Sequence, residues 1–329
     1  MSNYKIANVS QADYKMWDEF VDESPQGSIF SKTIWLNSVG CDYKILGCFD
    51  KSDRLIAGMP IVYDKNNIVM PKLTQTLGIL LSDFSEMKYV KRISKEKDII
   101  GEIVNNIPKV KGFNVSFHYN FTNWMPFMWK GYNEFTRYTY VIDDITDLTI
   151  VDANLLDKTK SVIKKARCNL CFSKNFSNRQ LYDLVSNTFS RQNLRIPFSY
   201  EWFNNLDMML SKSSASQKFF CIDRDNNLHS VLYLVFDSNT AYYLLGGYNP
   251  LYKDSGAMYL TIYEAIEFAS RVSKRFDFEG SIIPNIEHVF RSFGAKQIRF
   301  FNITKDNSIA SNIKNDLRKY GKLLLKAGY

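Results

Sequence analysis

The stretch that decides the fold is TAYYLLGGYNPLYKDSGAMYLTIYEAIEFASRVSKRFDFEGSII, residues 240–283. It begins with an apolar run at 241–245, which meets a glycine pair at 246–247. After a polar turn, residues 255–271 have the apolar spacing of a helix, and residues 275–281 form a second short run with aromatic residues at every other position. The stretch therefore predicts strand, loop, helix and strand in that order, which is typical of an α/β unit.

The start of this predicted helix is a candidate site for a phosphate-bearing ligand. The first turn of a helix leaves backbone N–H groups unpaired and carries a partial positive charge. Small residues, Ser255 and Gly256, let an anion approach that backbone closely. Lys253 and Tyr252 stand nearby in the sequence. A pyrophosphate is a natural ligand for such a site.

Length and composition predict two globular domains. The chain has 329 residues, of which 45% are hydrophobic and 15% aromatic, so it can bury large cores. A polar and acidic segment at 143–155 places the boundary between residues 1–150 and 151–329. The net charge of +8 favours anionic partners but does not choose among them.

Cysteine usage and the termini predict a cytoplasmic protein. Five cysteines form no even framework, which indicates a reducing compartment. Cys168 and Cys171 have CxxC spacing without a second pair, so no metal is expected. The residues after Met1 lack a signal pattern, and no run approaches the roughly 20 apolar residues that span a bilayer.

Two predicted hairpins suggest an internal duplication. Residues 44–63 and 219–236 each read as strand, polar turn and strand. Cys48-Phe49-Asp50 aligns with Cys221-Ile222-Asp223, an offset of about half the chain. Two copies of one α/β unit fit the length, although chance similarity between two hairpins is the alternative.

Several familiar catalytic signals are absent from the sequence. There is no GxxxxGK[ST], GxGxxG, HExxH or GxSxG pattern. Nucleotide hydrolysis, hydride transfer, metal hydrolysis and covalent catalysis therefore have no support. What remains is acyl transfer by direct attack of a substrate amine, which needs a proton acceptor and a donor for the developing oxyanion.

Two carboxylates at the end of the last predicted strand are candidates for that proton acceptor. Asp277 and Glu279 would share one strand face, with Phe276 and Phe278 on the other. A carboxylate beside an apolar strand tends to have a raised pKa, which suits a general base. Glu279 is the stronger candidate. The alternative is a structural ion pair with a nearby arginine.

Two further stretches leave alternatives open. A basic helix predicted at 156–166 is either a solvated surface or a contact for the phosphates of a nucleotide or RNA. Residues 118–132 are densely aromatic without a clean period, so they either line a ligand groove or pack between domains.

Motifs spread over nearly the whole chain resemble a known family. FDFEGS at 276–281, followed by IEHVFRSFGAK at 286–296, resembles the C-terminal end of a GNAT-type acyltransferase unit. The chain is similar to the group that includes the Fem-type peptidoglycan bridge transferases and related tandem-GNAT acetyltransferases. Further matching stretches are TQTLG at 74–78, NWMPFMW at 123–129, RYTY at 137–140 and Arg191-Gln192.

The resemblance implies an α/β (α+β) fold with two GNAT-like units in tandem, each a mixed, largely antiparallel sheet flanked by helices. The second unit would bind the acyl donor, acyl-CoA with acetyl-CoA as the simplest case, and no metal. Together with Lys253, the implied donor contacts are Leu245, Gly246, Gly247, Tyr248, Ser255, Gly256 and Ala257. The first unit would bind the acceptor, and the expected acceptor contacts are Gln75, Trp124, Tyr138 and Arg191.

The expected activity is N-acyl transfer from acyl-CoA to an amine of a sugar or cell-envelope precursor. The acceptor would be a small molecule or lipid-linked, and DNA is not an expected partner. The family's Q/RxxGxG/A loop is replaced by YNPLYK at 248–253. Two alternatives therefore stay open: a transferase that uses aminoacyl-tRNA, and a non-catalytic binding module on the same scaffold.

Overall fold

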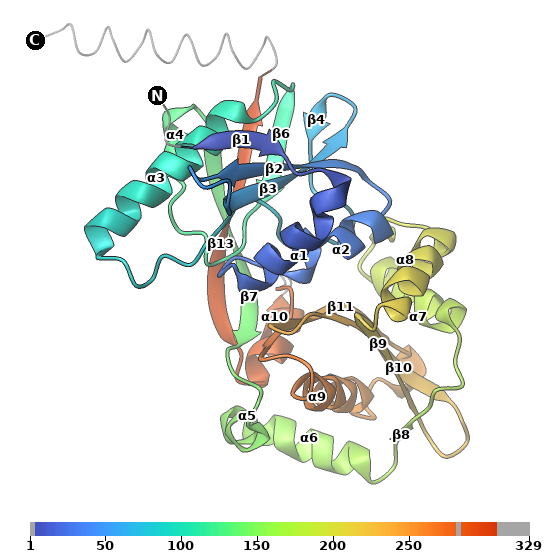
Figure 1. Cartoon of the computed structure of the whole chain (residues 1–329). Coiled ribbons are helices and arrows are strands. Elements are labelled where there is room, and N and C mark those ends of the chain that lie inside the picture. Colours follow the sequence, from blue (N-terminus) through green and yellow to red (C-terminus); the bar gives the residue numbers. More distant parts are fainter. Residues whose placement is uncertain (1–3, 281–283, 308–329) are drawn as a thin grey trace, which may run out of the picture. The chain divides into compact units, whose positions relative to one another are not determined.

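The computed structural model describes residues 4–280 and 284–307, which form two compact units (Figure 1). The first unit contains Cys41–Arg137 together with the described residues before Ser28 and after Arg299. The second contains Ser28–Gly40 and the described residues of Tyr138–Arg299. The units are therefore not continuous halves of the chain. The division into residues 1–150, which would bind the acceptor, and residues 151–329, which would bind the acyl donor, stays a proposal.

The first unit is built on a mostly antiparallel sheet with the strand order β1-β2-β3-β4-β6-β13, in which only β4 and β6 run parallel. The short strand β5 pairs with β3. The elements of this unit, including two strands that cross between the units, are β1 (Lys5–Asn8), η1 (Gln11–Asp13), α1 (Tyr14–Glu23), β2 (Asp42–Phe49), β3 (Leu55–Asp64), β4 (Asn67–Ile68), β5 (Leu80–Leu81), α3 (Tyr89–Asn106), β6 (Gly112–Ser116), α4 (Met125–Trp129), β7 (Asn133–Ile142) and β13 (Lys296–Asp306).

The second unit repeats this plan with the strand order β7-β12-β11-β10-β9-β8, in which only β11 and β12 run parallel. Its remaining elements are η2 (Ile29–Ser31), α2 (Thr33–Ser38), α5 (Leu148–Asn154), α6 (Asp157–Arg167), β8 (Cys171–Phe172), α7 (Asn178–Arg191), α8 (Tyr200–Lys212), β9 (Ser216–Ile222), β10 (Leu228–Phe236), β11 (Thr240–Tyr248), η3 (Pro250–Tyr252), α9 (Ala257–Ala269), β12 (Arg275–Asp277) and α10 (Pro284–Ser292). The predicted α/β (α+β) class is confirmed, because each unit combines a mixed, mostly antiparallel sheet with helices.

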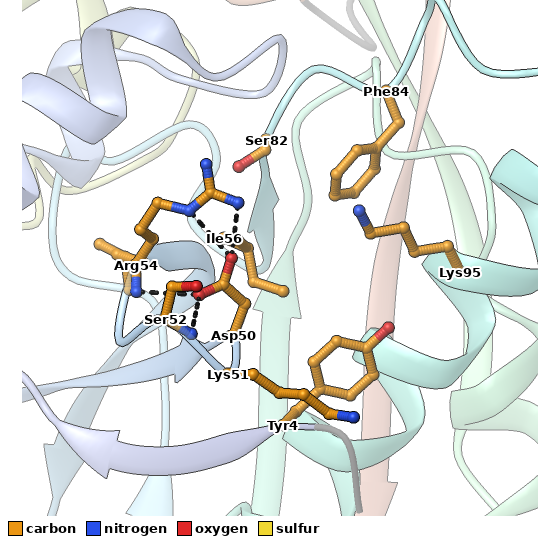
Figure 2. A pocket seen from close by; sticks show the side chains of 10 residues that line it. Tyr4, Asp50, Lys51, Ser52, Arg54, Ile56, Ser82, Phe84 and Lys95 are labelled. Carbon is orange, nitrogen blue, oxygen red and sulfur yellow. Dashed lines mark hydrogen bonds and ion pairs between the residues drawn. The ribbon is translucent and has the colours of Figure 1, made fainter.

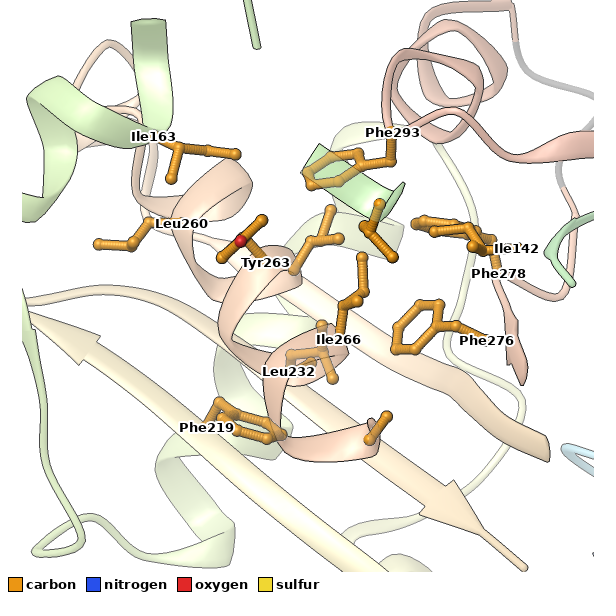
Figure 3. Close-up of a cluster of buried hydrophobic side chains, with 14 of the residues drawn as sticks. Ile142, Ile163, Phe219, Leu232, Leu260, Tyr263, Ile266, Phe276, Phe278 and Phe293 are labelled. Atoms are coloured by element: carbon orange, nitrogen blue, oxygen red, sulfur yellow. The ribbon is translucent and has the colours of Figure 1, made fainter. Parts of the chain in front are cut away.

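Helix α9 is the centre of the main core of the second unit (Figure 3). Leu260 and Ile266 of this helix are buried in the same apolar cluster as Leu232 of β10. Phe276 and Phe278 join the same cluster, and their ring centres are 5.0 Å apart. The apolar spacing that predicted a helix after residue 255 thus encodes the surface that α9 buries.

The two predicted hairpins repeat one turn geometry. In the first hairpin, one carboxylate oxygen of Asp50 accepts hydrogen bonds from the backbone N–H groups two and four residues later, at 2.8 and 3.1 Å. Asp223 does the same in the second hairpin, at 2.9 Å to each. The third residue after each aspartate, Asp53 or Asn226, has a positive φ of 54° or 62°. This equivalence supports the predicted internal duplication.

The aromatic stretch at 118–132 contributes partly to the core of the first unit. Phe121 and Phe127 are buried and pack around Phe117. Pro126, near the start of the five-residue helix α4, is compatible with the first turn of a helix. The side chain of Trp129 remains exposed. Core packing therefore explains part of this aromatic density.

One expected strand is shorter in the structure, and two helices were not expected. The strand expected at 275–281 ends at Asp277, because Glu279 and Gly280 have positive φ values of 59° and 69° that leave the extended conformation. Helices α5 and α10 were not expected, although Ile286, Val289 and Phe290 have helical spacing. The sequence also predicts a basic helix at 309–326, which lies outside the described residues.

Candidate functional site

The parallel strands β11 and β12 separate after three residue pairs. Thr240 to Tyr242 of β11 pair with Arg275 to Asp277 of β12, and β12 then ends. Strand β11 continues to Tyr248, while its other edge pairs with β10 along its length. Within the described residues, the edge of β11 from 243 to 248 therefore has no neighbouring strand. The backbone groups on that edge are therefore not paired to a strand in the described part of the chain, and the carbonyl oxygen of Tyr248 at its end accepts a hydrogen bond from Arg191.

A bulge interrupts β11 where this open edge begins. Tyr243 lies opposite Leu234 of β10, while Leu245 lies opposite the adjacent residue, Tyr233. Leu244 is thus an extra residue in the ladder. A bulge leaves such a residue out of the regular hydrogen-bond pattern and re-aims the backbone around it.

A pocket of about 490 Å³ lies beside the open edge and belongs wholly to the second unit. Helices α7, α9 and α10 form its other walls. Its lining is mainly apolar, with polar groups from α7 and from the start of α10. The lining residues are Thr188, Arg191, Gln192, Tyr243, Gly246, Gly247, Tyr248, Met258, Ile262, Asn285, Ile286, Val289 and Phe290.

The glycine pair allows close packing at this pocket. A Cβ atom on Gly247 would lie 2.8 Å from the carbonyl oxygen of Leu184 in α7, so the helix could not approach the strand as it does. A Cβ atom on Gly246 would lie 1.9 Å from the hydroxyl oxygen of Tyr243, which also lines the pocket. Burial raises the pKa of the Tyr243 hydroxyl.

Arg191 joins α7 to the end of β11. Its guanidinium donates hydrogen bonds to Oγ1 of Thr188 at 2.9 Å and to the carbonyl oxygen of Tyr248 at 3.3 Å. It also lies 4.6 Å from the centre of the Tyr248 ring, a cation–π geometry. The sequence assigned Arg191 to the acceptor, but the structure brings it together with Gly246, Gly247 and Tyr248 at one pocket.

The other predicted donor residues do not line this pocket. Gly256 begins α9 with a φ of +75°, and Oγ of Ser255 accepts a hydrogen bond from the N–H of Ala257 at 3.3 Å. A Cβ atom on Gly256 would lie 2.8 Å from Cγ1 of Val162, so α6 packs directly against this helix end. Lys253 and Leu245 are also absent from the lining. Phosphate binding at this helix start stays a prediction.

The loop between β11 and α9 is anchored to the second hairpin. The ring of His229 stacks on Tyr252 with centres 4.0 Å apart, and its Nε2 lies 3.1 Å from a carboxylate oxygen of Asp223. Asn249 donates its backbone N–H to the carbonyl oxygen of His229 at 2.7 Å. The duplicated turn therefore also holds the chain that leads into α9.

The two candidate carboxylates lie close together, but not on one strand face. Asp277 is fully buried and accepts hydrogen bonds from Oγ1 of Thr139 and, at 2.7 Å, from the backbone N–H of Glu279. Oε1 of Glu279 is shielded from solvent and has no hydrogen-bond partner in the described part of the chain. Burial, and then the charge of Asp277, raise the pKa of Glu279 well above its ordinary value. The expectation of a shared face is wrong because Glu279 has left the strand.

The predicted acceptor residues belong to different units. Gln75 and Trp124 lie in the first unit, where Trp124 packs against Phe301 with ring centres 6.3 Å apart. Tyr138 lies in the second unit and is 52% exposed. Of the four predicted acceptor contacts, Arg191 alone lines the pocket at β11.

Sequence reasoning missed most of the pocket walls. Thr188 of α7 and Ile262 of α9 lie among residues that looked like ordinary helix faces. The helical spacing of Ile286, Val289 and Phe290 is the one sequence signal for the wall from α10. No signal in the sequence showed that α7 would lie against Gly247.

The described residues contain neither a metal-binding cluster nor a membrane-spanning helix. No group of three or more histidine, cysteine, aspartate or glutamate side chains there is arranged to hold a metal ion. No helix in the same ranges is both long enough and apolar enough to cross a membrane.

Comparison with known proteins gives the class of this domain. Residues 177–281, which run from the start of α7 past Glu279, match the family described as acetyltransferase (GNAT) domain. This segment is a GNAT acetyltransferase domain, and the protein is a GNAT-fold acyltransferase. No curated protein matches the sequence.

Solved structures support the tandem arrangement of the fold. The chain is similar to a crystal structure of FemX, with a TM-score of 0.67 and 12% identity over 90% of this chain and 96% of that one. It is also similar to a tandem GNAT protein from the clavulanic acid biosynthesis pathway, with a TM-score of 0.52 and 7% identity over 93% and 99% of the two chains. The predicted tandem-GNAT, Fem-like fold is confirmed.

Proposed function

We propose that the protein is an N-acyltransferase that moves an acyl group from acyl-CoA to an amine of a sugar or cell-envelope precursor. The observation that carries this proposal is the pocket at the open edge of β11, whose walls from α7, β11 and α9 lie inside the GNAT domain. Acetyl-CoA is the simplest donor. The amine acceptor would be a small molecule or a lipid-linked precursor.

The pocket suits the pantetheine arm of a CoA thioester. That arm alternates amide groups with short apolar segments. The backbone of β11 from 243 to 248 would pair with the amides, as an added strand does. Met258, Ile262 and Val289 would contact the apolar segments. The glycine pair keeps this edge free of bulky side chains.

The chemistry needs only the donor, the acceptor amine and a proton acceptor. The amine nitrogen would attack the thioester carbonyl and form the C–N bond, after which the C–S bond breaks and CoA leaves as the thiolate, which then takes up a proton from solvent to become the thiol. Glu279 would accept the amine proton, directly or through water, with Asp277 as a positioning neighbour. The backbone at the Leu244 bulge is a candidate donor for the oxyanion.

The acceptor contacts remain proposals. The four residues that would help to bind the acceptor are Gln75, Trp124, Tyr138 and Arg191, and Arg191 also lines the donor pocket. Lys253, Ser255, Gly256 and Ala257 would bind the donor phosphates near the start of α9. A cytoplasmic location is part of the proposal, which the five free cysteines favour.

Release of CoA thiol from acetyl-CoA in the presence of a panel of amino sugars tests the proposal. We expect amine-dependent release that Glu279→Gln lowers about 100-fold or more in kcat, in the range of general-base catalysis, without changing KM for acetyl-CoA. Full turnover by Glu279→Gln would refute the base assignment. Saturable donor binding without turnover on any amine would favour a non-catalytic module.

Aminoacyl-tRNA is a second candidate donor, favoured by the exposed basic residues of α6. Lys158, Lys164, Lys165 and Arg167 are exposed on this helix, which packs against the start of α9. If charged tRNA were the donor, its affinity would fall steeply with salt concentration because bound counterions are released. A shallow salt dependence together with tight CoA binding would exclude it.

A further inference from the structure

A second pocket, in the first unit, has a lining that nothing in the acyl-transfer proposal uses. It has a volume of about 520 Å³ and opens beside the turn between β2 and β3 (Figure 2). Its walls come from the residue before β1, from that turn, from the segment after β5 and from α3. The lining residues are Tyr4, Asp50, Lys51, Ser52, Arg54, Leu55, Ile56, Ser82, Phe84 and Lys95.

The single carboxylate in this lining is already satisfied. Asp50 accepts hydrogen bonds from the backbone N–H groups of Ser52 and Arg54 at 2.8 and 3.1 Å. The Arg54 guanidinium adds two more, at 3.0 Å from Nε and 2.8 Å from Nη2. These bonds lower the pKa of Asp50, and they leave Arg54 and Asp50 as a neutral pair. Asp50 therefore does little to neutralise the other cations.

Two ammonium groups in the pocket lack an acidic partner. Across residues 4–280 and 284–307, no carboxylate oxygen lies within 4.0 Å of Nζ of Lys51 or of Lys95. Lys95 is partly buried, and its Nζ lies 4.2 Å from the centre of the Phe84 ring (Figure 2). A partly desolvated charge with no counterion favours binding of an anion.

The same pocket offers apolar surface for the rest of a ligand. The rings of Tyr4 and Phe84 lie on different walls, and Lys95 projects between them (Figure 2). The buried side chain of Ile56 adds apolar surface between the turn and α3. Aromatic rings present flat apolar faces that contact the faces or edges of other rings. Free cations and rings are thus combined in one cavity.

We propose that this pocket binds an organic phosphate. Its phosphate group would be held by Lys51 and Lys95, whose two free charges match a dianion. Its ring or other apolar part would contact Tyr4 and Phe84. The pocket belongs to the first unit, whereas the donor pocket belongs to the second, and the proposal does not depend on acyl transfer.

Phenyl phosphate is the minimal probe, because it carries one ring and one phosphate. Calorimetric titration into the full-length protein should show saturable binding. The affinity should exceed that of inorganic phosphate, and that of phenol, by about tenfold or more, because each fragment makes only one kind of contact. Absence of saturable binding at millimolar concentration would overturn the proposal, as would equal affinity for phenyl phosphate and inorganic phosphate.

Three variants locate the binding. Lys95→Met keeps an apolar side chain over Phe84 but removes the charge, and it should weaken phenyl phosphate about tenfold or more, as should Lys51→Ala. Lys91→Met is the matched control, since Lys91 is an exposed lysine of the same helix outside the pocket. An equal loss in Lys91→Met would show non-specific attraction and refute the site.

The ring contact is tested separately with Phe84→Leu. This variant should weaken phenyl phosphate and leave inorganic phosphate unchanged. Urea unfolding of each variant shows whether the first unit is still folded. If folded Lys51→Ala and Lys95→Met both bind phenyl phosphate as the wild type does, the assignment is wrong.

Discussion

Replacing Glu279 by glutamine should stabilise the second unit at pH 8 and leave its stability at pH 4 unchanged. The wild-type carboxylate has one oxygen shielded from solvent without a hydrogen-bond partner among the described residues, and it lies beside the charge of Asp277. Leaving a buried polar group unsatisfied costs about 1–3 kcal/mol, and more when the group is charged. Glutamine keeps the shape and removes the charge, so we expect a gain of about 1–3 kcal/mol at pH 8.

The pH dependence follows from the direction of the pKa shift. The pKa of Glu279 is raised in the folded protein, so the folded state binds this proton more tightly than the unfolded chain does. The stabilising effect of protonation is complete below the unfolded pKa of about 4.3, and it is lost as the pH rises through the folded pKa. In Glu279→Gln this loss is absent, so the difference between the two proteins grows with pH.

Urea unfolding at pH 4, 6 and 8, followed by circular dichroism, measures this difference if the slope with urea is unchanged. Glu86→Gln, at an exposed glutamate of the first unit, is the control and should shift stability by less than about 0.5 kcal/mol. A difference between wild type and Glu279→Gln that is the same at all three pH values would refute the reasoning. So would a Glu279→Gln variant that is less stable at pH 8.

Three further predictions concern the same region. If Glu279 is the base, it must lose its proton to act, so kcat should rise with pH through a pKa above that of an ordinary glutamate; a flat profile from pH 5 to 8 would contradict this role. Gly280→Ala should lower the free energy of unfolding in urea by about 2 kcal/mol or more. Its new Cβ atom would lie 2.2 Å from the Tyr138 carbonyl oxygen, and residue 280 has a φ of +69°. An unchanged urea midpoint would show that the loop rearranges. Phe278→Ala should cost about 3–5 kcal/mol because it opens a cavity in the main core, and a loss below 1 kcal/mol would mean that the core closes around the gap.

Periodicity in the sequence was enough to predict most of the fold. The spacing of apolar residues reflects which side of an element is buried. Such spacing is present in the helix after Gly256, in the two hairpins and in the strand that contains the glycine pair. The repeated turns at Asp50 and Asp223 could be predicted because each depends on one residue type at a fixed position. In each turn an aspartate carboxylate accepts hydrogen bonds from the backbone N–H groups two and four residues later. Local chemistry of this kind is written in the sequence.

The candidate site was less predictable because its walls depend on where elements meet. Strand β12 ends after Asp277 because two residues adopt positive φ, and nothing in FDFEGS requires a glutamate to do so. The approach of α7 to Gly247, and the link from Arg191 to Tyr248, depend on tertiary packing. Residue types and the resemblance of the motifs to a known family were enough to identify several of these residues as candidates. They did not show which of the residues lie together in one pocket.

Calorimetric titration of acetyl-CoA into wild type, Gly246→Ala and Gly101→Ala tests the central claim most directly. A Cβ on Gly246 would displace the end of the Tyr243 side chain within the β11 pocket, whereas a Cβ on Gly101 in α3 would meet no atom within 4 Å. We predict saturable binding to wild type and Gly101→Ala, and affinity about tenfold or more lower for Gly246→Ala. Absence of binding to wild type, or equal affinity in Gly246→Ala, would contradict the assignment of this pocket to the acyl donor.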